Sequence, residues 1–343
     1  MDRAEVLAKQ SLVKSPYYNY EALLVLIKVA ESRHQFQVAI NLAQKVLKDK
    51  PFHEGVLLTL VSSSLGFGKL KMALNYANQL VNLSPGMEPY AMRALVLLAQ
   101  GKDDLALNDF ANALKAETSD EPRQSAWVRS LIGRNYLKHG QIKNAELYLK
   151  SALKILPEFH MALALMADLE VERGNYETAN LFFLKAFKAK QEPPYLMRHA
   201  KLKEHLGDNE SANKLRYEAE KLIREEMAAG PYGHHNELAQ LLLDRADPKL
   251  LPEAIAEAKR DADTRGTSES YYLLSQAFYR ARLLEDAKQS INQAIASGIT
   301  SCDYRKLASK IDGEMGGLKF KGHFSRECLN VSVSTLLASV GIL

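Results

Sequence analysis

The stretch Glu121–Pro157, EPRQSAWVRSLIGRNYLKHGQIKNAELYLKSALKILP, decides the fold of this 343-residue chain. When Ala126 is numbered as position one, small residues fall at position eight (Gly133) and position twenty (Ala145). Apolar residues recur around them at three- and four-residue intervals, the spacing of a stripe along one side of an α-helix. Gly140 at position fifteen separates two such stripes, and a proline closes the stretch at position thirty-two. The pattern predicts a helix–turn–helix hairpin whose two helices approach closely at their small residues.

The small residue at position twenty recurs along most of the chain. Successive spacings are 34, 33, 39, 34, 33, 42 and 33 residues, so the period is about 34 with two insertions. One match would be weak evidence, whereas eight aligned units predict a repeated hairpin. No hairpin can bury its apolar stripe alone, so neighbouring units must stack into one continuous core. The residues at position twenty are Ala39, Ala73, Ala106, Ala145, Ala179, Ala212, Ala254 and Ala287.

This pattern of small, aromatic and proline positions resembles the tetratricopeptide repeat (TPR), a 34-residue helix–turn–helix unit. The resemblance covers most of the chain, and the later repeats are similar in style to those of bacterial TPR arrays. It implies an all-α fold, a right-handed superhelical solenoid of helix–turn–helix repeats, with a non-catalytic role in protein binding.

The alignment also divides the chain. Two insertions, Lys115–Ser125 and Glu225–Asn236, interrupt the period, and the second is expected either to bend the solenoid or to leave the stacking uncut. The start in mid-repeat suggests a fragment, or a chain whose ends a partner covers. The expected parts are a half repeat with only a second helix (1–17), units 1–3 (20–118), units 4–6 (126–229), units 7–8 (235–300), a partial ninth unit (301–318) and an irregular C-terminal tail (319–343).

Composition excludes several classes of protein. The 45 Lys and Arg residues against 41 Asp and Glu give a net charge of +4 with both signs interleaved, so no nucleic-acid partner is expected. No run of about 20 apolar residues could span a membrane. The charged start MDRAEVLAKQ is not a secretory signal. Two cysteines are too few for a disulfide scaffold. We expect a cytoplasmic protein, or a periplasmic or membrane-associated one if the N-terminus is truncated.

Several short motifs suggest chemistry, and each is better explained by repeat architecture. The segment Gly66–Lys69 (GFGK) lacks the complete phosphate-loop pattern and follows no strand. His234 and His235 are adjacent and therefore point apart, and Cys302, His323 and Cys328 lack the spacing of metal ligands. No nucleophile with a matching base can be named either. We therefore expect no enzymatic activity, no metal and no cofactor.

The TPR resemblance places a binding groove along the first helices of the units. In that family, groove-facing residues fall near positions two, five, six, nine and thirteen. A tryptophan beside basic residues is suited to anchor a peptide, and basic groups favour an acidic or C-terminal carboxylate ligand. The chaperone-binding carboxylate clamp of the family is absent. The candidate groove residues of units 4–6 are Trp127, Arg134, Lys138, Met161, Asp168, Arg198 and Lys201.

Two functions follow as hypotheses. The first is a scaffold or adaptor that binds a protein or peptide segment in its concave groove. The alternative is the regulatory or substrate-presenting part of a larger enzyme, secretion or assembly complex. The sequence identifies neither the partner nor the oligomeric state.

Overall fold

The computed structural model describes residues 2–15, 19–229, 233–296 and 302–316. These residues form eighteen α-helices and one short 3₁₀-helix, η1 (Pro248–Leu250), and contain no strand. The predicted all-α solenoid of helix–turn–helix units is therefore confirmed. The tail predicted at 319–343, with His323 and Cys328, lies outside the described residues.

The helices alternate between first and second helices of hairpins, after an unpaired α1 (Asp2–Lys14). The first helices are α2 (Tyr20–Ser32), α4 (Glu54–Gly66), α6 (Met87–Ala99), α8 (Pro122–Lys138), α10 (His160–Glu172), α12 (Pro193–His205), α14 (His235–Asp244), α16 (Ser268–Arg280) and α18 (Cys302–Glu314). The second helices are α3 (Phe36–Asp49), α5 (Leu70–Leu83), α7 (Asp103–Lys115), α9 (Ile142–Ile155), α11 (Tyr176–Ala189), α13 (Asn209–Ala229), α15 (Leu251–Arg265) and α17 (Leu284–Ala296).

Each hairpin turns at a residue with positive φ, the backbone region that favours glycine. Position fifteen has this conformation in seven of the eight aligned units, and five of them in succession have glycine there. His34 (φ 55°) and Arg282 (φ 62°) occupy the same position in the first and eighth units. In the seventh unit, η1 lengthens the turn and Ala246 has the positive φ instead. The five glycines are Gly68, Gly101, Gly140, Gly174 and Gly207.

The small residues allow the paired helices to approach closely. A Cβ atom at Gly133 on α8 would lie 2.8 Å from Cγ of Leu149 on α9, closer than carbon atoms pack. Ala145, which faces the same contact, is fully buried. The hairpin α8–α9 therefore depends on glycine at position eight and alanine at position twenty.

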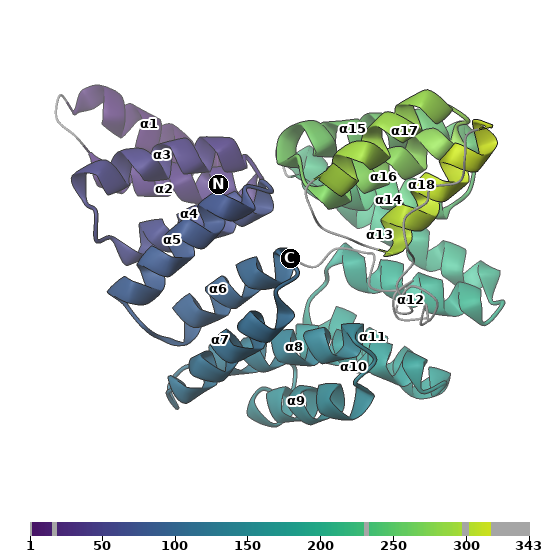
Figure 1. The fold of residues 1–343 in the computed structure, drawn as a ribbon, viewed down its shortest axis with the longest axis horizontal. Helices are drawn as coiled ribbons and strands as arrows, with labels where there is room; N and C mark the ends of the chain where they lie inside the picture. The colour runs from purple at the N-terminus through teal and green to yellow at the C-terminus, as the bar shows by residue number, and fades with distance from the viewer. Residues whose placement is uncertain (1, 16–18, 230–232, 297–301, 317–343) are drawn as a thin grey trace.

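The stacked hairpins curl around a central axis. Figure 1 shows α1–α5 on the left, α6–α11 along the bottom and α13–α18 at the upper right. Apolar side chains continue across both insertions: one cluster joins Phe110 on α7 to Val128 on α8, and another joins Ile223 on α13 to Leu238 on α14. The insertions therefore leave the core uninterrupted. None of the described helices has both the length and the apolar character needed to cross a bilayer.

Candidate functional site: the inner face

The first helices form one side of the solenoid. Successive first helices pack against one another, as α8 does against α10 and α14 against α16. At the lower edge of the molecule, α8 lies on the inner side and α9 on the outer side (Figure 1). Sequence-distant side chains can therefore meet on this inner face.

Two of the predicted groove residues form a buried ion pair. The guanidinium of Arg198 on α12 contacts the carboxylate of Asp168 on α10, and their side chains are only 4% and 3% exposed. Arg198 also donates a hydrogen bond to the Ala164 carbonyl (3.2 Å) and lies 5.6 Å from the ring centre of Phe183. Burial lowers the pKa of Arg198, and the charge of Arg134 lowers it further. The pair thus ties unit five to unit six, and neither side chain is available as a free groove group.

Charges from opposite walls face each other across the inner space. Arg134 on α8 is half-buried, and burial lowers its pKa while Glu269 on α16 raises it. Glu269 keeps contact with solvent, yet protein surrounds it closely enough that burial raises its pKa, with Arg265, Arg134 and Lys138 opposing. Charges close to protein act over a longer range than charges on an open surface, because protein is a poorer dielectric than water.

The remaining predicted groove residues differ in accessibility. Lys138 is exposed, whereas Met161 is buried. Trp127 is half-buried against the apolar cluster of α6–α10. Lys201 on α12 forms an ion pair with Asp244 on α14 (3.5 Å). Of these residues Lys138 is the most accessible, and Arg134 and Trp127 are both half-buried on the same helix.

The sequence-based selection missed two acidic residues of this face. Glu269 occupies position two of the eighth unit, so extending the position rule beyond units 4–6 would have found it. Asp244 could not be found in this way because η1 disturbs the repeat spacing of the seventh unit. Both are carboxylates that partly balance the basic residues of the inner face.

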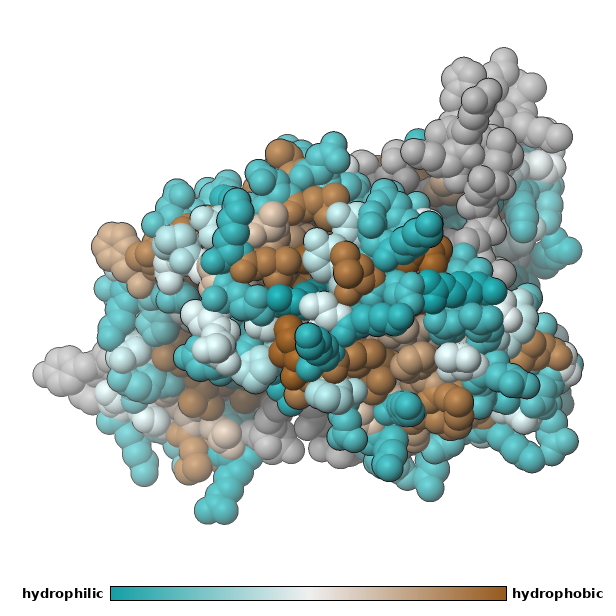
Figure 2. All heavy atoms as spheres, turned by 90° about the horizontal axis from the view of Figure 1, so that it is seen from below, coloured by the Kyte–Doolittle hydropathy of each residue, from teal (hydrophilic) through white to brown (hydrophobic). Residues whose placement is uncertain are grey.

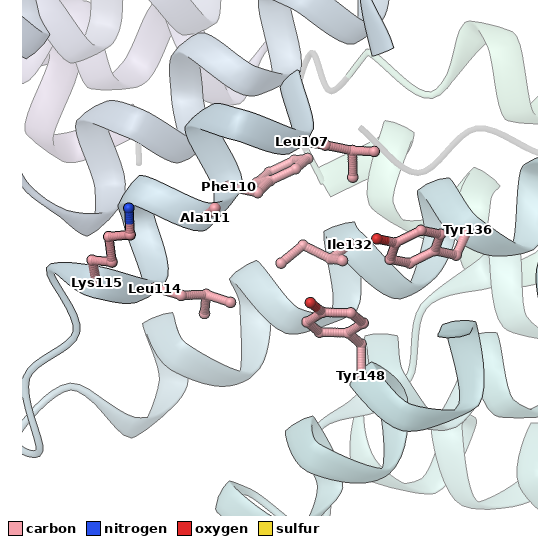
Figure 3. A pocket seen from close by; sticks show the side chains of 8 residues that line it. All are labelled: Leu107, Phe110, Ala111, Leu114, Lys115, Ile132, Tyr136 and Tyr148. Carbon is pink, nitrogen blue, oxygen red and sulfur yellow. The ribbon is translucent and has the colours of Figure 1, made fainter. Parts of the chain in front are cut away.

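A second candidate site lies at the first insertion. A cavity of about 360 Å³ opens between α7, α8 and α9, and Figure 3 shows the hydroxyl groups of Tyr136 and Tyr148 turned toward Ile132. The two rings stack with centroids 5.6 Å apart. Burial raises the pKa of Tyr136, and Tyr148 adds to the effect. The lining is mostly apolar, with Lys115 at its edge, and it holds no acid–base pair that could support catalysis.

The outer surface offers an apolar strip. Leu105, Leu147, Leu181 and Leu184 on the second helices α7, α9 and α11 are each about half exposed or more. Figure 2, which views the molecule from below, shows apolar side chains gathered among hydrophilic ones on this side. Scattered exposed leucines are common on soluble proteins, so the strip by itself indicates no function.

The described residues contain no group of three or more His, Cys, Asp or Glu side chains placed to hold a metal ion. His234 contacts Glu226 (2.8 Å), and His235 contacts Glu257 (2.6 Å). The segment Gly66–Lys69 joins α4 to α5 as an ordinary hairpin turn. Cys302 is the first residue of α18.

Comparison with known proteins identifies the fold. No protein-family model matches the chain, and no curated protein matches its sequence. Yeast Tom70 superposes with a TM-score of 0.52 at 17% identity, over 82% of this chain and 59% of Tom70. The human IFIT1 dimer with PPP-AAAA superposes with a TM-score of 0.51 at 15% identity, over 87% of this chain and 78% of IFIT1.

The Cut9 chain of the APC/C Cut9–Hcn1 hetero-tetramer, with a TM-score of 0.49 at 15% identity, aligns over 90% of this chain and 59% of its own. This chain therefore spans 59% of the length of Tom70 and of the Cut9 match. The structural neighbours are TPR proteins, and the chain is a helical repeat array with the TPR fold.

Proposed function

We propose that this chain is a non-catalytic scaffold that holds an acidic peptide segment of a partner protein against its inner face. The observation that carries the proposal is the position of Arg134. Its side chain is half-buried on α8, where burial lowers its pKa and Glu269 on α16 raises it, and Lys138 follows one helical turn later. A cation in such surroundings binds a carboxylate more strongly than a cation on an open surface does.

The other side chains of the inner face support the same chemistry. Trp127 lies two turns before Arg134 on α8 and keeps part of its ring accessible. Trp and Arg supply most of the binding energy at protein interfaces. The inner face is also already built by the packed first helices, so little conformational entropy is lost when a segment binds. Glu269 on the opposite wall would repel acidic residues, which confines the acidic part of the ligand to the α8 side.

The proposal predicts that Arg134→Ala weakens binding of an acidic peptide about tenfold, since hot-spot arginines contribute on this scale. The probes are two fluorescent pools of random ten-residue peptides, one with two glutamates in every member and one with two lysines. Fluorescence anisotropy measures binding to the wild type, to Arg134→Ala and to Trp127→Ala. Lys154→Ala is the matched control, because Lys154 is an exposed cation on the outer helix α9.

The proposal is wrong if the glutamate pool binds Arg134→Ala and Trp127→Ala as tightly as the wild type while both variants remain folded. If Lys154→Ala loses as much affinity for the glutamate pool as Arg134→Ala does, the peptides are attracted to the basic surface in general. Because IFIT1 is a structural neighbour seen with PPP-AAAA, that oligonucleotide is added as a competitor. Displacement of the peptide pool by PPP-AAAA would favour nucleic acid as the ligand.

A further inference from the structure

The first hairpin of the solenoid meets the seventh at one point. His34, in the turn between α2 and α3, places its Nδ1 atom 3.0 Å from the carbonyl oxygen of Gly233, which precedes α14. Nη2 of Arg265, the last residue of α15, lies 3.0 Å from the same Nδ1 and 3.4 Å from the Gly233 oxygen. His34 is 199 residues from Gly233 and 231 from Arg265 along the chain. These contacts close the curled stack around its inner face.

The surfaces fit tightly at this contact. A Cβ atom at Gly233 would lie 2.5 Å from Nδ1 of His34, so only glycine leaves room for the imidazole ring. The His34 ring stacks on Phe36 with centroids 5.5 Å apart and meets His234 edge-on at 6.5 Å. A second pair of turns touches beside it, because a Cβ atom at Gly68 would lie 3.2 Å from the Gly266 oxygen.

The hairpin turn itself does not require the histidine. His34 has a φ of 55° at the position where the next five units have glycine, and glycine adopts this conformation without steric cost. A non-glycine residue held in this region is typical of positions under a functional constraint. Here the side chain makes the contact with Gly233 and Arg265.

We propose that His34, Gly233 and Arg265 form an acid-released latch that holds the solenoid closed around its inner face and, when open, admits a partner segment. The admission of a partner rests on the proposed function. The closure and its release do not, because they concern only contacts within the chain.

Protonation of His34 opposes closure. A second proton on the imidazole would place a positive charge beside the Arg265 guanidinium and near His234. Burial lowers the pKa of His34 to about 4, Arg265 and His234 lower it further, and the Gly233 carbonyl and Asp261 oppose these effects. Asp261 is itself paired with Arg265 (3.1 Å), and His234 with Glu226 (2.8 Å). The balance at the closed contact therefore favours a neutral imidazole.

The direction of the pH dependence follows from the difference between the pKa of His34 in the closed form and its pKa in the open form. In the open form, His34 is solvated and returns to its ordinary pKa of 6.5. The latch is therefore at full strength above pH 6.5 and weakens as the pH falls toward 4. Because opening raises the pKa of His34 from about 4 to 6.5, proton binding favours the open form as the pH falls. The ratio of closed to open molecules is therefore expected to fall about 30-fold between pH 7.5 and pH 5.

The test measures the distance between α3 and α15 in the full chain. Spin labels are attached through non-canonical amino acids at Gln37 on α3 and Asp263 on α15, which are both exposed, so that the cysteines remain untouched. Pulsed electron–electron double resonance at pH 7.5 and pH 5 gives the distribution of distances between the two labels. Circular dichroism verifies that the helices remain folded. The same labels are placed in His34→Gly, Gly233→Ala and Arg282→Gly.

At pH 7.5 the wild type should give one short distance, and at pH 5 a longer population should appear. His34→Gly should show the longer population at both pH values, and it should fold because glycine is the usual residue at this turn. Gly233→Ala should open in the same way through its clash with His34. Arg282→Gly is the matched control, because Arg282 has the same turn conformation in unit eight and pairs with Glu314 at the exposed end of α18; it should behave as the wild type.

The latch is refuted if His34→Gly keeps the short distance at pH 7.5, or if its distances still change with pH as those of the wild type do. It is also refuted if the wild type keeps the short distance at pH 5. These outcomes do not depend on any peptide, so failure of the latch and failure of the inner-face binding site are distinguished by separate measurements.

Discussion

Replacing Asp168 with alanine is expected to lower the free energy of unfolding by about 3–5 kcal/mol, because Arg198 would remain buried without its counter-ion. Both side chains are almost fully enclosed between α10 and α12. The remaining contacts of Arg198, with the Ala164 carbonyl and the Phe183 ring, do not neutralise its charge. Urea denaturation followed by circular dichroism measures the change.

Removing both charges provides the control. The double variant Asp168→Leu/Arg198→Met should recover most of the lost stability, since apolar residues of similar size commonly replace a buried ion pair without a large cost. Lys214→Ala, which removes one partner of an exposed ion pair with Glu210, should leave the denaturation curve unchanged. If the denaturation curve of Asp168→Ala matches that of the wild type, the ion pair is not buried as described.

Replacing Gly133 with leucine is expected to lower the free energy of unfolding by about 1–3 kcal/mol through overpacking. Even the first added carbon would lie 2.8 Å from Cγ of Leu149, and the neighbouring Ala145 leaves no free space. Thermal denaturation measures the loss. Shortening the opposing side chain should relieve it, so Gly133→Leu/Leu149→Ala should be more stable than Gly133→Leu alone.

The matched control for this substitution is Gly313→Leu. Gly313 also lies within a helix, α18, but an added Cβ atom there meets nothing within 4 Å. This variant should be as stable as the wild type or slightly more so, because glycine is a poor helix former. Equal destabilisation of both variants would mean that helix propensity, and not the close approach of α8 and α9, explains the glycine at position eight.

The repeat determined how much of the fold could be predicted. Helix–turn–helix units follow from spacings within about 34 residues, where local periodicity and small residues define the packing. The contact between His34 and Gly233 could not be predicted in this way. It depends on the rotation between successive hairpins, summed over six units, and no single stretch of sequence encodes that sum.

The site was predicted less completely than the fold. The position rule selected Asp168 and Arg198 as groove residues, but it could not show that they neutralise each other. It also could not show that Lys201 is paired with Asp244 of a later unit. Such pairings depend on the side-chain packing of adjacent first helices, whereas the rule considers each unit separately. Arg134 and Lys138 lie one helical turn apart on α8, the first half-buried and the second exposed.

A charge exchange on the inner face tests the central claim most directly. The variant Arg134→Glu/Lys138→Glu is titrated with the glutamate and lysine peptide pools, beside the wild type and Leu181→Ser, whose substitution lies on the apolar outer strip. We predict that the wild type and Leu181→Ser prefer the glutamate pool and that the charge-exchanged variant prefers the lysine pool. An unchanged preference for the glutamate pool in that variant, with the fold intact, would contradict peptide binding at the inner face.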